Sequence, residues 1–151
     1  MKAGPIIELL RANCPSFSNR VVGAAEFNEA FVNETALPVP HAFVITGFSA
    51  GEAAQTAGIV TQALRDEASV VLCVDNTADD NGYAGADEVQ DLMEEIWPVL
   101  IGWVPATGYG GLQFEGGSLL DATRARLWYV ADFYDSMTQQ NAAMSEEAAA
   151  A

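Results

Sequence analysis

Residues 116–136 read GGSLLDATRARLWYVADFYDS and hold Arg124 and Arg126, two of the six basic residues of the chain. The aromatic and β-branched residues after Arg126 favour a β-strand, because such side chains suit a pleated, half-buried surface. We therefore predict a hairpin in which residues 112–120 pair with residues 123–133. This hairpin puts an antiparallel sheet at the centre of the expected fold.

Side chains along residues 123–133 alternate between the two faces of that sheet. One face carries the residues expected in the core, namely Ala125, Leu127, Tyr129, Ala131 and Phe133. The other face is amphipathic and carries Arg124, Arg126, Trp128, Val130 and Asp132. A solvated face and a subunit interface both fit this second pattern, so the residues alone leave both alternatives open.

Three helices are expected elsewhere in the chain. Apolar residues recur at helical spacing over residues 4–13 and 24–33, which predicts two short amphipathic helices. A longer helix is expected over residues 89–101, where apolar side chains return every three or four positions.

Extended segments are expected over residues 42–48 and 59–75. Between them, residues 49–58 read SAGEAAQTAG, and this composition predicts a small-residue loop. The order of helices and strands predicts an α+β fold: a mostly antiparallel four-stranded sheet with helices packed on one face.

The length of 151 residues fits a single domain with one core. We expect this domain to cover residues 1–137 and an alanine-rich C-terminal extension to cover residues 138–151, which a neighbouring protein would order. Glu8 and Arg11 interrupt the apolar core that a signal peptide needs, and no apolar run approaches the roughly 18 residues of a spanning helix. The protein is therefore expected to be made and kept in a cytoplasm.

Charge is the strongest compositional feature, with 21 acidic and 6 basic residues and a net charge of −15. Direct binding to nucleic acid is disfavoured, because affinity for phosphate comes from Lys and Arg. The acidic surface fits a role in solubility, or a surface past which nucleic acid slides without adhering.

No motif for catalysis or cofactor binding is found. His41 follows Pro40 with no nearby nucleophile and is interpreted as a turn residue. Cys14 and Cys73 lack metal or redox spacing and are expected to be buried thiols. We therefore expect neither an enzyme nor a cofactor.

Residues 77–88 come nearest to a metal site. Asp79, Asn81, Gly82 and Glu88 fall at positions three, five, six and twelve of a calcium loop. Position one is Thr77 instead of aspartate, and a strand precedes the loop where a helix would be needed. A polar turn is the preferred interpretation, so no metal is expected.

Several longer segments form a pattern of their own. They are IIELLRANCPSF and RVVGAAEF near the N-terminus, then HAFVITGFSA, SVVLCVDN, LIGWVPA and GGSLLDATRARLWYVADF. Together they resemble the tail terminator proteins of Mu-like and related bacteriophages, over nearly the full length to about Ser136. The sharpest part is the pattern GG-x-LL-x(3)-RARLWY. The chain departs from the family pattern at Pro98 and in the alanine-rich tail after Thr138.

The resemblance implies a structural virion protein and not an enzyme. Such a protein is expected to form a hexameric ring that caps the tail tube, stops its polymerisation and joins the tail to the head connector. The implied partners are other copies of the chain, the tail tube protein and the head–tail connector protein. Genomic DNA would pass through the ring without sequence-specific binding. The expected location is the neck of the virion, after assembly in the host cytoplasm.

Subunits with a net charge of −15 repel one another. A ring must then either place its few cations opposite carboxylates of neighbours or bury enough apolar surface to overcome the repulsion. The candidate interface with a neighbour or the tube consists of Arg124, Arg126, Trp128 and Asp132, with Trp128 as an apolar anchor. Pairing of the arginines within their own subunit, for instance with Asp132, is the equal alternative.

The sequence also fits two other functions. A different head–tail completion protein would share a small α+β fold but bind a different neighbour. An acidic host-directed binding protein, such as a DNA mimic, would use the negative charge to occupy a basic partner.

Overall fold

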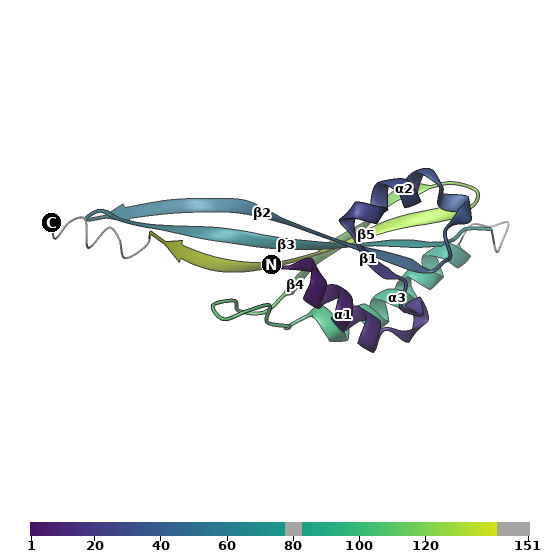
Figure 1. Ribbon diagram of the computed structural model, residues 1–151, viewed down its shortest axis with the longest axis horizontal. Helices are drawn as coiled ribbons and strands as arrows, with labels where there is room; N and C mark the ends of the chain where they lie inside the picture. The colour runs from purple at the N-terminus through teal and green to yellow at the C-terminus, as the bar shows by residue number, and fades with distance from the viewer. Residues whose placement is uncertain (78–82, 142–151) are drawn as a thin grey trace.

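The computed structural model describes residues 1–77 and 83–141 and shows one five-stranded sheet in the order β1-β2-β3-β5-β4 (Figure 1). The strands are β1 (Val21–Gly23), β2 (His41–Thr56), β3 (Ile59–Asp75), β4 (Gln113–Ala122) and β5 (Arg126–Gln140). Only β1 runs parallel to its neighbour, β2; the other pairs are antiparallel. The predicted α+β fold and mostly antiparallel sheet are confirmed, with β1 as an additional strand.

Helices lie on both faces of the sheet (Figure 1). The α-helices are α1 (Ala3–Asn13), α2 (Phe27–Val32) and α3 (Ala84–Leu100), and short 3₁₀ turns are η1 (Pro15–Phe17), η2 (Ala24–Glu26) and η3 (Glu34–Ala36). Helices α1 and α3 cover one face, as expected. Helix α2 covers part of the opposite face, which the sequence pattern left without a helix, because Phe27 and Phe31 share one side of α2 and pack on the sheet.

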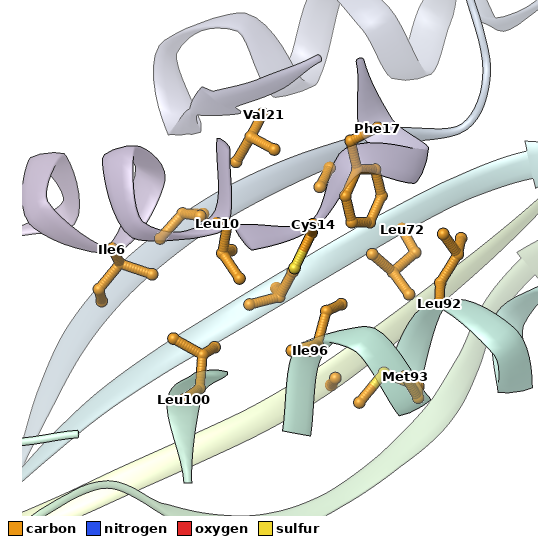
Figure 2. Packing of buried hydrophobic residues seen from close by; sticks show 14 of the residues in the cluster. Ile6, Leu10, Cys14, Phe17, Val21, Leu72, Leu92, Met93, Ile96 and Leu100 are labelled. Carbon is orange, nitrogen blue, oxygen red and sulfur yellow. The ribbon is translucent and has the colours of Figure 1, made fainter. Parts of the chain in front are cut away.

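The larger core lies between the sheet and helices α1 and α3 (Figure 2). Ile6 and Leu10 project from α1, and Leu92 and Ile96 project from α3. Each pair is four residues apart and so lies on one side of its helix. The sheet contributes the residues predicted from the alternation in β5: Leu127, Tyr129, Ala131 and Phe133 belong to or pack against this core.

The smaller core lies under α2. Trp128 and Phe43 are completely buried there, and the Trp128 ring centroid is 5.8 Å from Phe27 and 5.0 Å from Phe31. Edge-on and tilted ring pairs of this kind add to the stabilisation from burial. The amphipathic face of β5 is thus covered by an element of its own subunit.

Strands β2 and β3 continue well past the helices as an extended arm (Figure 1). We use the term arm for residues 48–64 together with residues 136–140 of β5. The loop predicted for residues 49–58 is wrong, because this segment is paired with β3 up to Thr56. Ala57 and Gly58 form a two-residue turn with positive φ at both positions, which matches the twist of a hairpin.

Pairing with β3 also carries β5 past the domain boundary expected at residue 137. Thr138 lies opposite Ala63, and the strand ends at Gln140. Residues 142–151, which make up most of the expected C-terminal extension, lie outside the described residues.

Candidate assembly surfaces

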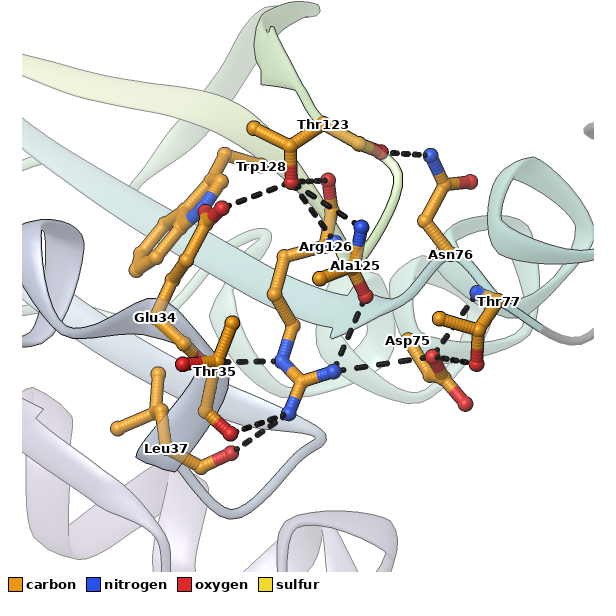
Figure 3. A network of polar contacts seen from close by, with 10 residues as sticks. All are labelled: Glu34, Thr35, Leu37, Asp75, Asn76, Thr77, Thr123, Ala125, Arg126 and Trp128. Carbon is orange, nitrogen blue, oxygen red and sulfur yellow. Dashed lines mark hydrogen bonds and ion pairs between the residues drawn. The ribbon is translucent and has the colours of Figure 1, made fainter.

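Arg126 begins β5 and is bound within its own subunit (Figure 3). Its guanidinium donates from Nε to Glu34 O at 3.1 Å and from Nη2 to Leu37 O at 3.2 Å. Asp75 Oδ1 lies 3.7 Å from Nη1, and only 14% of the Arg126 side chain is exposed. The carbonyl oxygens and the carboxylate replace water that the cation loses on burial. Arg126 therefore fastens the segment before β2 to the start of β5.

Glu34 connects the same segment to Trp128 (Figure 3). Trp128 Nε1 donates to Glu34 Oε2 at 2.8 Å, and Thr123 Oγ1 donates to Glu34 Oε1 at 2.7 Å. One carboxylate of η3 thus holds both β5 and the turn between β4 and β5. The sequence pattern placed Trp128 on a charged face but gave no sign of Glu34, which is 94 residues away.

Asp132 and Arg124 differ in their surroundings. Asp132 is half-buried and accepts a hydrogen bond from Ser69 Oγ at 2.6 Å. Arg124 is exposed in the turn between β4 and β5 and has no hydrogen bond or ion pair with any residue that the structure describes. Three of the four candidate interface residues, Arg126, Trp128 and Asp132, therefore form hydrogen bonds within their own subunit. The arginines do not pair with Asp132.

Arg65 is a second engaged cation, which sequence reasoning did not identify as part of a site. Its guanidinium carbon lies 3.9 Å from the Tyr134 ring centroid, and its Nε donates to Glu67 at 2.9 Å. Glu115 of β4 forms a further ion pair with it. These partners come from three strands, and only the register of the sheet brings them together.

Most of the positive charge is consequently used inside the subunit. Besides Arg65 and Arg126, Arg11 donates to Val21 O and Arg20 donates to Pro40 O, each at 2.9 Å. Of the six basic side chains, only Lys2 and Arg124 have no such partner among the described residues.

Two buried carboxylates lie side by side beneath the loop that connects α3 to β4. Asp66 and Asp135 are paired across β3 and β5 and are at most 3% exposed. Asp66 accepts from Tyr109 Oη at 2.6 Å and from the Met1 amino group, while Asp135 accepts from Gly111 N at 2.8 Å. The hydrogen bond to Asp66 raises the pKa of Tyr109 to about 12. These carboxylates hold the loop on the sheet.

His41, Cys14 and Cys73 are bonded or buried within the fold. His41 is half-buried at the start of β2, its Nδ1 is 3.1 Å from Pro38 O, and burial lowers its pKa. Cys14 and Cys73 are buried thiols as predicted, and burial raises their pKa values to about 11 and about 12.

The calcium-loop pattern falls largely outside the described residues, which exclude Asp79, Asn81 and Gly82. Glu88, its last position, lies on α3, and burial together with Asp75 and Asp91 raises its pKa. Within residues 1–77 and 83–141, no group of three or more His, Cys, Asp or Glu side chains could hold a metal ion. The helices in these same ranges are too short or too polar to cross a membrane.

Among the exposed apolar side chains of the described residues are one on the β2 edge and one on the β4 edge of the sheet. On the β2 edge, Phe48 is 72% exposed at the base of the arm. On the β4 edge, Leu119 is 58% exposed beside a groove of about 360 Å³ between α3 and the sheet. The groove is lined by Ala86, Val89, Gln90, Met93, Trp97, Leu119, Leu127 and Tyr129. We call it the α3–β4 groove.

The Tyr129 wall of this groove depends on a glycine. Tyr129 lies opposite Leu119 in the β4–β5 ladder, and its ring extends over Gly117. A Cβ atom at Gly117 would overlap the Tyr129 ring. The absence of a side chain at this position therefore sets the shape of the groove.

This is a small α+β domain in which four of the six basic side chains are bonded within the fold. It exposes apolar side chains on its arm and beside a groove, which is the character of a structural assembly subunit. The comparison with protein families agrees with this class. The family described as phage tail terminator protein matches residues 1–142, and the chain belongs to this family. It is accordingly a structural protein of the bacteriophage tail, from a family of virion proteins not known as enzymes. No curated protein matches the chain.

Proposed function

We propose that the chain forms a ring, hexameric in the expected form, that caps the tail tube, ends its polymerisation and joins the tail to the head connector. The proposal rests on one observation, the family match over residues 1–142. The partners are further copies of the chain, the tail tube protein and the head–tail connector protein. The location is the neck of the virion, after assembly in the host cytoplasm.

The structure supports this role through the arm. Residues 48–60 are exposed, and two-stranded or three-stranded ribbons without a covering layer gain little stability from burial. An arm of this kind gives a subunit a surface that assembly can cover. The net charge of −15 also fits a channel through which DNA passes without adhering, because a ring with carboxylates on its inner surface offers phosphates no cation to bind.

Deletion of the gene for this chain from its phage tests the proposal. Electron microscopy of the lysate is expected to show tails of abnormal, variable length that lack a head, and expression of the chain in trans should restore uniform tails. Uniform free tails without heads would instead indicate a completion protein that joins but does not terminate. Normal particles would remove the structural role and favour the acidic host-directed binding protein.

Arg124 keeps its place at a candidate interface in this proposal, with Arg126 and Trp128 supporting the turn that presents it through Glu34. Asp132 lies farther along β5, bonded to Ser69. The substitution Arg124→Ala is expected to weaken ring or tube contacts, seen as longer or uneven tails. Lys2→Ala is the matched control, because it removes the other cation without a partner in the described chain. Equal tail lengths for the two variants would contradict an interface role for Arg124.

A further inference from the structure

We propose that neighbouring subunits of the ring join through Phe48 of one copy, which enters the α3–β4 groove of the next copy. This inference rests on the ring of the proposed function and names the contact that holds it together. The occupant of the groove is therefore a second copy of this chain.

Electrostatics indicates what kind of contact can hold the ring. Each subunit has a net charge of −15. Of its six basic side chains, only Lys2 and Arg124 have no partner among the described residues. Two such cations cannot offset the repulsion between adjacent subunits through ion pairs. Of the two ways to close a ring, burial of apolar surface that carries no charge is therefore the one that this chain can use.

The arm provides the first half of an uncharged contact. Glu52 is the only charged residue between positions 45 and 64. Phe48 lies on this segment and is 72% exposed. An exposed aromatic ring on a weakly charged segment of an acidic protein has the features of an interface anchor.

The α3–β4 groove provides the second half. None of its lining residues is charged, and its volume of about 360 Å³ lies in the range of about 300–1,000 Å³ typical of binding pockets. Leu119 stands exposed at its rim. Trp97, one of its walls, has a buried Nε1 without a hydrogen-bond partner among the described residues. An aromatic side chain can enter this groove without bringing carboxylates of the two copies together there.

The positions of the two surfaces fit repeated head-to-tail contact. Phe48 lies on β2 beyond the part of its edge that β1 covers, whereas Leu119 lies on β4, the opposite edge of the sheet. One subunit can therefore use both surfaces at once, each toward a different neighbour. Contacts between two different patches generate a ring when the rotation closes.

Backbone pairing between the same two edges is a weaker explanation. Strand β4 has irregularities between Phe114 and Gly116 and between Leu119 and Asp121. Bulges of this kind interrupt the row of backbone groups that an added strand would need. Side-chain insertion does not require a regular ladder.

Disulfide trapping in assembled particles tests the contact. The phage would encode Phe48→Cys together with Leu119→Cys, and purified particles would be oxidised and run on a non-reducing gel. Because each subunit contributes both thiols to different neighbours, we expect a ladder of covalent multimers up to the copy number of the ring. Either cysteine alone should leave a monomer band. The native Cys14 and Cys73 are buried and should not contribute.

The matched control replaces one partner with an equally exposed residue elsewhere, Val32→Cys with Leu119→Cys, which should give no ladder. Particles with a visible ring and uniform tails but no Phe48–Leu119 ladder would overturn this contact while leaving the proposed function intact. Absence of any ring at the end of the tail would remove the proposed function itself. If the double variant prevents assembly, Phe48→Ser and Val32→Ser compared by native mass spectrometry of rings decide the question: equal ring yields contradict the proposal.

Discussion

The two halves of β2 pair with the same strand, β3, but have opposite surroundings. Residues 42–44 are buried between α1 on one face and α2 on the other, whereas residues 48–56 are exposed throughout. Hydrogen bonding to β3 is available to both halves, so the difference lies in the apolar surface removed from water. In the body of the domain, where helices α1, α2 and α3 cover the sheet, this burial stabilises the fold. In the arm the same ladder fixes a shape with little burial of apolar surface.

The largest test of this comparison is Trp128→Ala. The substitution removes the central side chain of the core under α2 and leaves Glu34 without one donor, so we expect the free energy of unfolding to fall by about 3–5 kcal/mol. Urea denaturation followed by circular dichroism measures it. Val32→Ala, at an exposed position on α2, is the control and should stay within about 0.5 kcal/mol of wild type. A loss below about 1 kcal/mol for Trp128→Ala would mean that the α2 face adds little to stability.

Hydrogen exchange sharpens the comparison along β2 and β3 themselves. In the free protein, amide protons of residues 52–56 should exchange at least about a hundredfold faster than those of residues 70–74, a difference of about 2.7 kcal/mol in opening free energy. The arm has few apolar contacts to lose on opening, while the centre of β3 opens only with the body. If the proposed ring covers the arm, protection of these amide protons should rise in assembled particles. Equal protection in the free protein would show that the arm is stable on its own.

Arg126→Met tests the body at the point where η3 meets β5. The apolar side chain would leave the carbonyl groups of Glu34 and Leu37 without their donor, and we expect a loss of about 1–3 kcal/mol in unfolding free energy. Arg124→Met, two residues earlier and exposed, should change it by no more than about 0.5 kcal/mol. Similar losses for both would contradict the difference in surroundings between the two arginines.

The smallest effect is expected at high pH. The pKa of Tyr109 is raised from its ordinary value of 10.0 to about 12 by its hydrogen bond to Asp66. A group whose pKa is raised by folding contributes fully below its unfolded pKa, so this contribution is intact below about pH 10 and is lost as the pH rises toward about 12. Thermal unfolding of wild type and Tyr109→Phe across this range measures it. The gap between them should narrow as the pH rises, and a constant gap would contradict this role for Tyr109.

The sequence predicts the body of the fold well, because periodic burial leaves a periodic pattern. The apolar spacing of residues 89–101 corresponds to most of α3, and the continuous strand predicted for residues 59–75 is β3 itself. The β2 part of the arm, residues 49–56, was missed because Ala and Gly, which are depleted in strands, make up much of this segment. Only pairing with β3 extends them, and that pairing has no local signature.

The candidate site was harder to predict for a related reason. Alternation correctly placed Arg126 and Trp128 on one face of β5, but an arginine bonded to carbonyl groups gives the same sequence pattern as an arginine in water. Its partners, the backbone oxygens of Glu34 and Leu37, are independent of side-chain identity. The groove likewise depends on how α3 lies against β4, which no single segment encodes.

The position of the Tyr129 ring over Gly117 restricts which substitutions position 117 can accept. Any single-nucleotide change that converts the Gly117 codon to another residue adds a Cβ where the ring lies, and so alters the groove wall without touching the buried core. Arm positions such as Ala54 face open solvent on the isolated subunit and can drift at little cost to folding. Evolutionary variation among phages that carry this protein should therefore be low at position 117 and high at exposed arm positions.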